Sequence, residues 1–88
     1  MKIFNESFTI STKGEVDFID LTNKIQDMVE KSGISNGLAH VFAPHATGVL
    51  ILTEYEPSLA NDIKSVLEKL IPKRAPYQHP ANAHSHLR

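Results

Sequence analysis

The chain has 88 residues, and 9 Lys and Arg stand against 10 Asp and Glu, so the formal net charge is −1 with neutral histidines. This length predicts a single domain over residues 1–88, and the lack of a basic excess argues against a nucleic-acid or membrane-surface partner. There is no cysteine for a disulfide, no signal-peptide pattern, and no apolar run longer than residues 49–52. We therefore expect a cytoplasmic protein that oligomerises, binds a metal or is a piece of something larger.

The first half of the chain predicts two extended segments and a helix. Residues 2–11 alternate in part between apolar and polar, and residues 16–19 continue an extended segment after a turn. Asp20 or Thr22 can then cap a helix, and Gly33 can end it in the left-handed conformation. Its apolar face follows helical spacing: Leu21, Ile25, Met28 and Val29.

The second half repeats this order. Residues 37–43 alternate, and residues 49–53 are a continuous apolar run of strand length. A second helix follows, with Ser58 as its cap and Pro72 as its stop. Its expected buried face is Leu59, Ile63, Val66, Leu67 and Leu70. The residues after Lys73 show no periodicity and predict a loop.

This order of elements predicts an α+β fold. We expect a small, mostly antiparallel sheet with two helices packed on one of its faces. The apolar faces of both helices should then be buried against that sheet.

The histidines are the first candidate site residues. His79, His84 and His86 lie in the final segment, and His45 lies between the two central extended segments. Neutral imidazole is the commonest ligand of zinc and similar ions, and side chains on loops can converge on one point. The alternative is a solvated, histidine-containing tail, because this spacing is not a specific motif. His40, on an alternating segment, favours a hydrogen-bonded residue at the sheet surface.

Carboxylates and hydroxyls supply further candidates. Glu54 can be a general base, a metal ligand or the orienter of a ligating histidine, whereas Glu56 favours the amino end of the second helix. Thr47, close to His45, offers donors to an anion, although a simple turn would contain the same residues. Asp62 lies opposite the apolar helix face and is expected to be solvated. Three cations either hold a phosphate or provide solubility: Lys73, Arg74 and Arg88.

Two stretches, HVFAPHATGVLILTEYEP over residues 40–57 and YQH with NAHSHLR over residues 77–88, resemble one known family. It is the uncharacterised YjbQ-like family, often labelled secondary thiamine-phosphate synthase. Its pattern has a His-Thr-Thr-like turn, an apolar strand ending in Asn-Glu or similar, an aromatic-x-His, and an Asn-containing loop ending in Ala-His-aliphatic-basic. In this sequence the pattern falls on His45, Thr47, Glu54, His79, Asn82 and His86.

The resemblance implies an α+β protomer in a homotrimer, with a divalent metal, zinc in our expectation, held by His45, His79 and His86. His84 occupies a position where relatives often have Asp and would support the ligands. Only residues 80–81 separate the aromatic-x-His from the Asn-containing loop, where the family usually has a longer insertion. The C-terminal third of the family pattern is also absent, which implies a truncated domain.

The same resemblance implies an enzyme that acts on a phosphorylated small molecule, as in thiamine-phosphate synthesis. Glu54 would orient a ligand or act as base, and Thr47 would donate to an oxyanion. The alternatives are a metal-assisted hydrolase and a non-catalytic, oligomeric metal- or ligand-binding protein.

Overall fold

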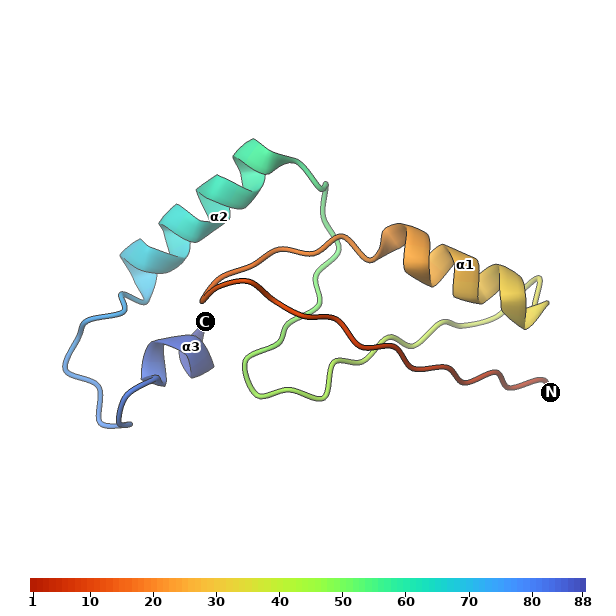
Figure 1. Ribbon diagram of the computed structural model, residues 1–88, viewed down its shortest axis with the longest axis horizontal. Coiled ribbons are helices and arrows are strands. Elements are labelled where there is room, and N and C mark those ends of the chain that lie inside the picture. Colours follow the sequence, from red (N-terminus) through yellow and green to blue (C-terminus); the bar gives the residue numbers. More distant parts are fainter. The chain divides into compact units, whose positions relative to one another are not determined.

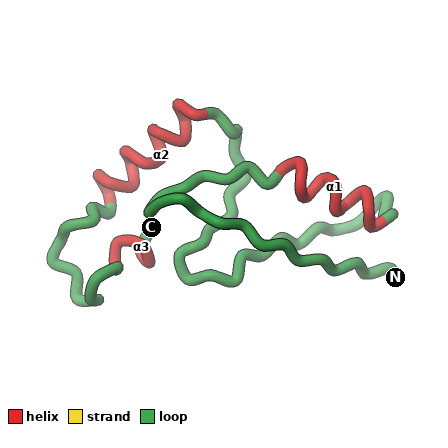
Figure 2. The backbone as a smooth tube through the Cα atoms, viewed as in Figure 1, coloured by secondary structure: helices red, strands yellow, loops and turns green.

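The computed structural model describes all of residues 1–88 and contains three helices. They are α1 (Thr22–Ser32), α2 (Pro57–Leu70) and α3 (Ala83–Leu87). The helices appear in this order along the ribbon in Figure 1, and the rest of the chain is loop and turn, as Figure 2 shows. The chain divides into two compact units, Met1–Val41 with α1 and Phe42–Arg88 with α2 and α3.

The predicted α+β fold with an antiparallel sheet is wrong, because the structure has no strand. The four segments predicted as strands are present without a partner strand. Backbone hydrogen bonds outside the helices join residues two to four positions apart, such as Gly48 N–H to the His45 carbonyl. Alternation in a sequence tells which side chains could share a face, but a strand also needs the backbone groups of a second strand.

The predicted α1 is confirmed, and so is its end at Gly33. Gly33 has φ 70°, the left-handed conformation, and its N–H donates to the Glu30 carbonyl. The amino end differs from the prediction, since Leu21 is the cap residue and no side chain caps the helix. Asp20 instead accepts hydrogen bonds from the hydroxyl and the N–H of Thr22 at 2.6 and 3.0 Å. These two bonds lower the pKa of the Asp20 carboxyl.

Within this first unit, the N-terminal segment touches α1 through charged side chains. The Lys24 ammonium lies 4.5 Å from the ring centroid of Phe8, a cation–π contact. Lys31 and Glu6 form an ion pair at 3.1 Å. Contacts of this kind near the protein surface contribute little to stability.

The predicted α2 is confirmed, with Glu56 rather than Ser58 as its cap. Glu56 is extended, and its carboxylate accepts hydrogen bonds from the N–H groups of Ser58 and Leu59 at 3.1 and 2.9 Å. Pro57 occupies the first helical position, where its missing N–H costs nothing. The N–H groups of Ser58 and Leu59 hold the pKa of the Glu56 carboxyl below its usual value. Pro72 follows the last turn, as expected from the sequence.

The expected burial of the α2 face is wrong in part. Leu59, Ile63 and Leu67 are half-buried, whereas Val66 and Leu70 are exposed, Leu70 at 73%. The single buried apolar residue is Ala83, at 5% exposure. Without a sheet, nothing lies against the whole of the predicted apolar face, so its edge residues remain in solvent.

Candidate metal centre

The predicted loop after Lys73 contains a short helix, α3, that the sequence analysis missed. Asn82 is its cap residue, and the Asn82 carbonyl accepts hydrogen bonds from the N–H groups of Ser85 and His86. Ala81 has φ 66°, an uncommon conformation for a residue with a Cβ, and it turns the chain into the helix. A helix of five residues is too short to show an apolar repeat, which explains why periodicity gave no signal.

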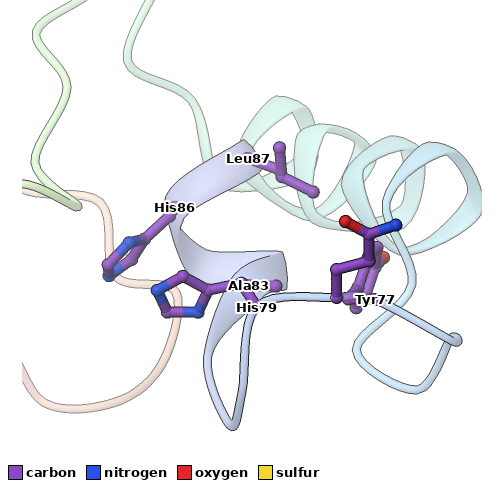
Figure 3. Close-up of a pocket in the computed structure, with 6 residues that line it drawn as sticks. Tyr77, His79, Ala83, His86 and Leu87 are labelled. Atoms are coloured by element: carbon purple, nitrogen blue, oxygen red, sulfur yellow. The ribbon is translucent and has the colours of Figure 1, made fainter.

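This turn brings two of the predicted ligands together. The ring centroids of His79 and His86 lie 5.1 Å apart, with the ring planes tilted by 49°. Figure 3 shows the two imidazoles facing one another, His86 from α3 and His79 from the preceding loop. With metal–nitrogen bonds of about 2.0–2.1 Å, two imidazoles on one tetrahedral ion have their centroids about 5 Å apart.

The hydrogen bonding of His79 also suits a ligand. Its Nδ1 lies 2.9 Å from the Pro80 carbonyl oxygen. A carbonyl can only accept, so Nδ1 carries the proton and the lone pair of the neutral ring is on Nε2. Ligating histidines in proteins are typically held in this way, by a carbonyl or carboxylate on the other ring nitrogen.

The two histidines line a small pocket of about 270 Å³. Its other walls are Tyr77, Gln78, Ala83 and Leu87, so no Lys, Arg, Asp or Glu side chain lines it. The Tyr77 hydroxyl donates to the Pro72 carbonyl, which fixes the phenol ring in the wall of the pocket. The pocket is therefore mainly apolar, and its wall includes the two imidazoles together with the side chains of Tyr77 and Gln78.

His45 is engaged differently. Its Nδ1 accepts a hydrogen bond from the Thr47 N–H at 3.1 Å, and the Thr47 hydroxyl lies 2.9 Å from the same nitrogen. The neutral His45 ring therefore carries its proton on Nε2, and its one lone pair faces Thr47. In this arrangement neither His45 nitrogen offers a free lone pair, and the Thr47 donors face His45 rather than an oxyanion.

The three predicted ligands are consequently not grouped. No set of three or more His, Cys, Asp or Glu side chains is arranged to hold a metal ion. The donor chemistry of His79 and His86 fits a divalent metal as a pair, whereas the lone pair of His45 is engaged by Thr47 N–H.

The remaining candidates lie as follows. Glu54 is exposed in the segment before α2, and Glu56 caps that helix, as its charge suggested. Asp62 and His40 are exposed. His84 is 4% exposed, its Nε2 lies 3.3 Å from the Ser85 hydroxyl, and its Nδ1 has no hydrogen-bond partner.

Arg88 has a role that the sequence analysis did not predict. The sequence predicted either a phosphate contact or a solvated side chain. The Arg88 guanidinium instead binds the Ile71 carbonyl and the Glu68 carboxylate. The sequence signal was its place at the end of the Ala-His-aliphatic-basic pattern, but no local pattern identifies a partner 17 residues away.

The family described as UPF0047 protein YjbQ-like matches residues 6–88 of this chain. The chain therefore belongs to that family, and the resemblance inferred from its sequence is confirmed. It is 38% identical over 91 residues to a UPF0047 protein of Methanothermobacter thermautotrophicus, covering 100% of this chain and 64% of that relative. A UPF0047 protein of Archaeoglobus fulgidus is 36% identical over 83 residues, 91% of this chain and 64% of its own length.

A more distant relative is the UPF0047 protein YugU of Bacillus subtilis, 25% identical over 80 residues, 90% of this chain and 58% of that protein. The chain thus spans less than two thirds of the length of these three relatives. No solved structure shows a significant match. No helix of the chain is long and apolar enough to cross a membrane.

Proposed function

We propose that this chain binds a divalent metal ion, zinc by preference, through His79 and His86. The observation that carries the proposal is the 5.1 Å separation of the two imidazole centroids. The bond from His79 Nδ1 to the Pro80 carbonyl supports it, because it leaves Nε2 free to bind the ion. A structural zinc site takes four protein ligands and a catalytic one typically takes three, so two imidazoles leave room for further donors.

His45 is our proposed third ligand. To bind the ion, His45 would first have to lose its hydrogen bond from Thr47. It could then bind through Nε2, with its proton moved to Nδ1, or turn its ring and bind through Nδ1. His84 would support the ligands from its buried position in α3.

As an activity, we propose an enzyme that acts on a phosphorylated small molecule, as the family label of thiamine-phosphate synthesis suggests. There a pyrimidine pyrophosphate couples with a thiazole phosphate and releases pyrophosphate. A bound divalent ion would supply neutralising charge for the pyrophosphate that leaves. Of the chain's own residues, Glu54 would orient a ligand or accept a proton, and Thr47 would donate to an oxyanion once its contact with His45 is broken.

A second candidate is a non-catalytic, oligomeric metal-binding protein. The pocket favours this candidate, since no cation lines it to hold a phosphate. Exposed large apolar side chains, among them Phe42 at 72%, support self-association, and the family resemblance implies that the assembly is a homotrimer.

Calorimetric titration of the full chain with Zn²⁺ tests the metal proposal. We expect binding by the wild-type chain, strong loss in His79→Gln and His86→Gln, and a smaller loss in His45→Gln. His40→Gln is the matched control, because it removes an exposed histidine outside the pocket. Equal binding by all four variants would contradict the assignment of the ligands.

Turnover assays of the zinc-loaded chain separate the candidate activities. Release of pyrophosphate from the two thiamine precursors would support the synthase. Release of phosphate from a panel of phosphoesters would support a hydrolase, and zinc binding with no turnover would favour the non-catalytic candidate.

A further inference from the structure

Arg88 joins the end of α3 to the end of α2. Its Nε and Nη2 both donate to the Ile71 carbonyl oxygen, at 3.0 and 2.8 Å, and Nη2 also lies 2.7 Å from a carboxylate oxygen of Glu68. The Arg88 side chain is only 11% exposed, whereas the Glu68 side chain is 60% exposed. The two hydrogen bonds from Arg88 to the Ile71 carbonyl are thus largely buried, whereas the Arg88–Glu68 ion pair is partly exposed to solvent.

Ile71 is the residue at which α2 ends. Its N–H donates to the Leu67 carbonyl, and its own carbonyl is one of the groups that a helix end leaves without an intrahelical partner. A guanidinium at this position satisfies that carbonyl and places positive charge at the negative end of the helix dipole.

Arg88 is also the residue at which α3 ends. The Arg88 N–H donates to the His84 carbonyl, and Arg88 is the C-terminal cap residue of the helix. A helix of five residues is not stable by itself in water, so α3 depends on contacts outside it.

A second contact holds the other end of this segment. The Tyr77 hydroxyl donates to the Pro72 carbonyl. Two neighbouring carbonyls after α2, those of Ile71 and Pro72, therefore hold residues 77–88 at both ends, with His79 and His86 between the two contacts.

We propose that Arg88 is a positioning residue for the His79–His86 pair. By fixing the end of α3 to the Ile71 carbonyl, it holds the His86 imidazole opposite that of His79. Arg88 itself does not line the pocket, so it would position the ligands without contacting the ion. This inference rests on the proposed metal function.

The test measures Zn²⁺ affinity and the geometry of the His79 and His86 rings in three full-length chains: the wild type, Arg88→Ala and Arg88→Lys. We expect Arg88→Ala to weaken zinc binding by about 10-fold, the lower end of the loss that follows removal of a ligand's own hydrogen-bond partner, because Arg88 acts on His86 only through α3. Lysine can replace one hydrogen bond but not the fork, so Arg88→Lys should restore part of the affinity. Lys69→Ala is the matched control, because it removes another cation from the end of α2 without removing the contact to Ile71.

A measurement on the metal-free chain separates this inference from the metal proposal. We expect a nuclear Overhauser contact between the His79 and His86 ring protons in the wild-type chain and its loss in Arg88→Ala. If the wild-type chain binds no zinc, the proposed function fails, and this contact alone decides whether Arg88 positions the rings.

Two results would overturn the proposal. One is wild-type zinc affinity together with an unchanged ring–ring contact in Arg88→Ala. The other result applies if Arg88→Ala loses its helical circular dichroism, which would show that this variant does not fold. Arg88→Lys is then the variant to measure. Wild-type zinc affinity and an unchanged ring–ring contact in Arg88→Lys would overturn the proposal.

Discussion

His45 and Thr47 are joined through a single ring nitrogen, since the Thr47 N–H donates to His45 Nδ1 at 3.1 Å and the Thr47 hydroxyl lies 2.9 Å from the same atom. His79 shows the opposite arrangement, because its Nδ1 faces a carbonyl oxygen. The two histidines that the family pattern pairs as ligands therefore differ in the position of their proton.

This difference predicts opposite tautomers in the metal-free chain. In the neutral form of each ring, His45 should carry its proton on Nε2 and His79 should carry its proton on Nδ1. Two-dimensional ¹H–¹⁵N spectra of the imidazoles at about pH 8 distinguish these forms. The same tautomer at both positions would contradict the described hydrogen bonding.

The Glu56 cap predicts a dependence of α2 on acid. The pKa of Glu56 is lowered from 4.5, so the cap stabilises the folded chain fully above that value and loses its effect as the pH falls through the folded-state pKa. Glu56→Gln should thus lower helical circular dichroism and the urea midpoint at neutral pH. The difference from the wild-type chain should vanish at low pH.

Glu54→Gln is the matched control for this experiment. It removes a neighbouring exposed carboxylate that does not cap the helix. A loss of helix in Glu54→Gln equal to that in Glu56→Gln would show that the effect is general charge and not capping.

The left-handed conformation of Gly33 predicts a cost for any side chain there. A Cβ at φ 70° is strained, and it would also lie 3.1 Å from Lys2 Nζ. Gly33→Ala should therefore lower the free energy of unfolding by about 1 kcal/mol or more. Gly14→Ala is the control, since a Cβ there meets nothing within 4 Å and should leave the urea midpoint unchanged or slightly raised.

How far the sequence predicts this structure depends on how local each feature is. The helices α1 and α2 follow from apolar spacing, and Gly33 marks the end of α1, because these features depend on neighbours within a few residues. Residues 49–53 have the composition of a buried strand, but pairing depends on distant backbone groups that the local pattern does not reveal.

The candidate site also has features that depend on nearby residues and features that depend on distant ones. His79 and His86 are seven positions apart, and one turn of chain around Ala81 brings them together, so their proximity is a nearly local property. His45 is far from them in sequence, and the family pattern names it as a ligand without describing its bond to Thr47. The role of Arg88 could not be predicted, because it depends on the carbonyl at which α2 ends.

The exposed apolar residues predict self-association. Leu52 is fully exposed in a run of apolar residues, and such a surface is stabilised by contact with another chain. We expect sedimentation at micromolar concentration to show a homotrimer, and Leu52→Asp to dissociate it. Thr53→Asp adds the same charge at the next position as a control, and a well-behaved 9.8 kDa monomer of the wild-type chain would refute the trimer.

The most direct measurement of the central claim is the ¹⁵N spectrum of the histidine rings during addition of Zn²⁺. We expect His79 Nε2 and one His86 nitrogen to shift to values typical of coordination, while His79 Nδ1 keeps its proton because the Pro80 carbonyl accepts its hydrogen bond. The His40 ring should not change. Saturating Zn²⁺ that leaves the His79 and His86 nitrogens unshifted would contradict the metal centre.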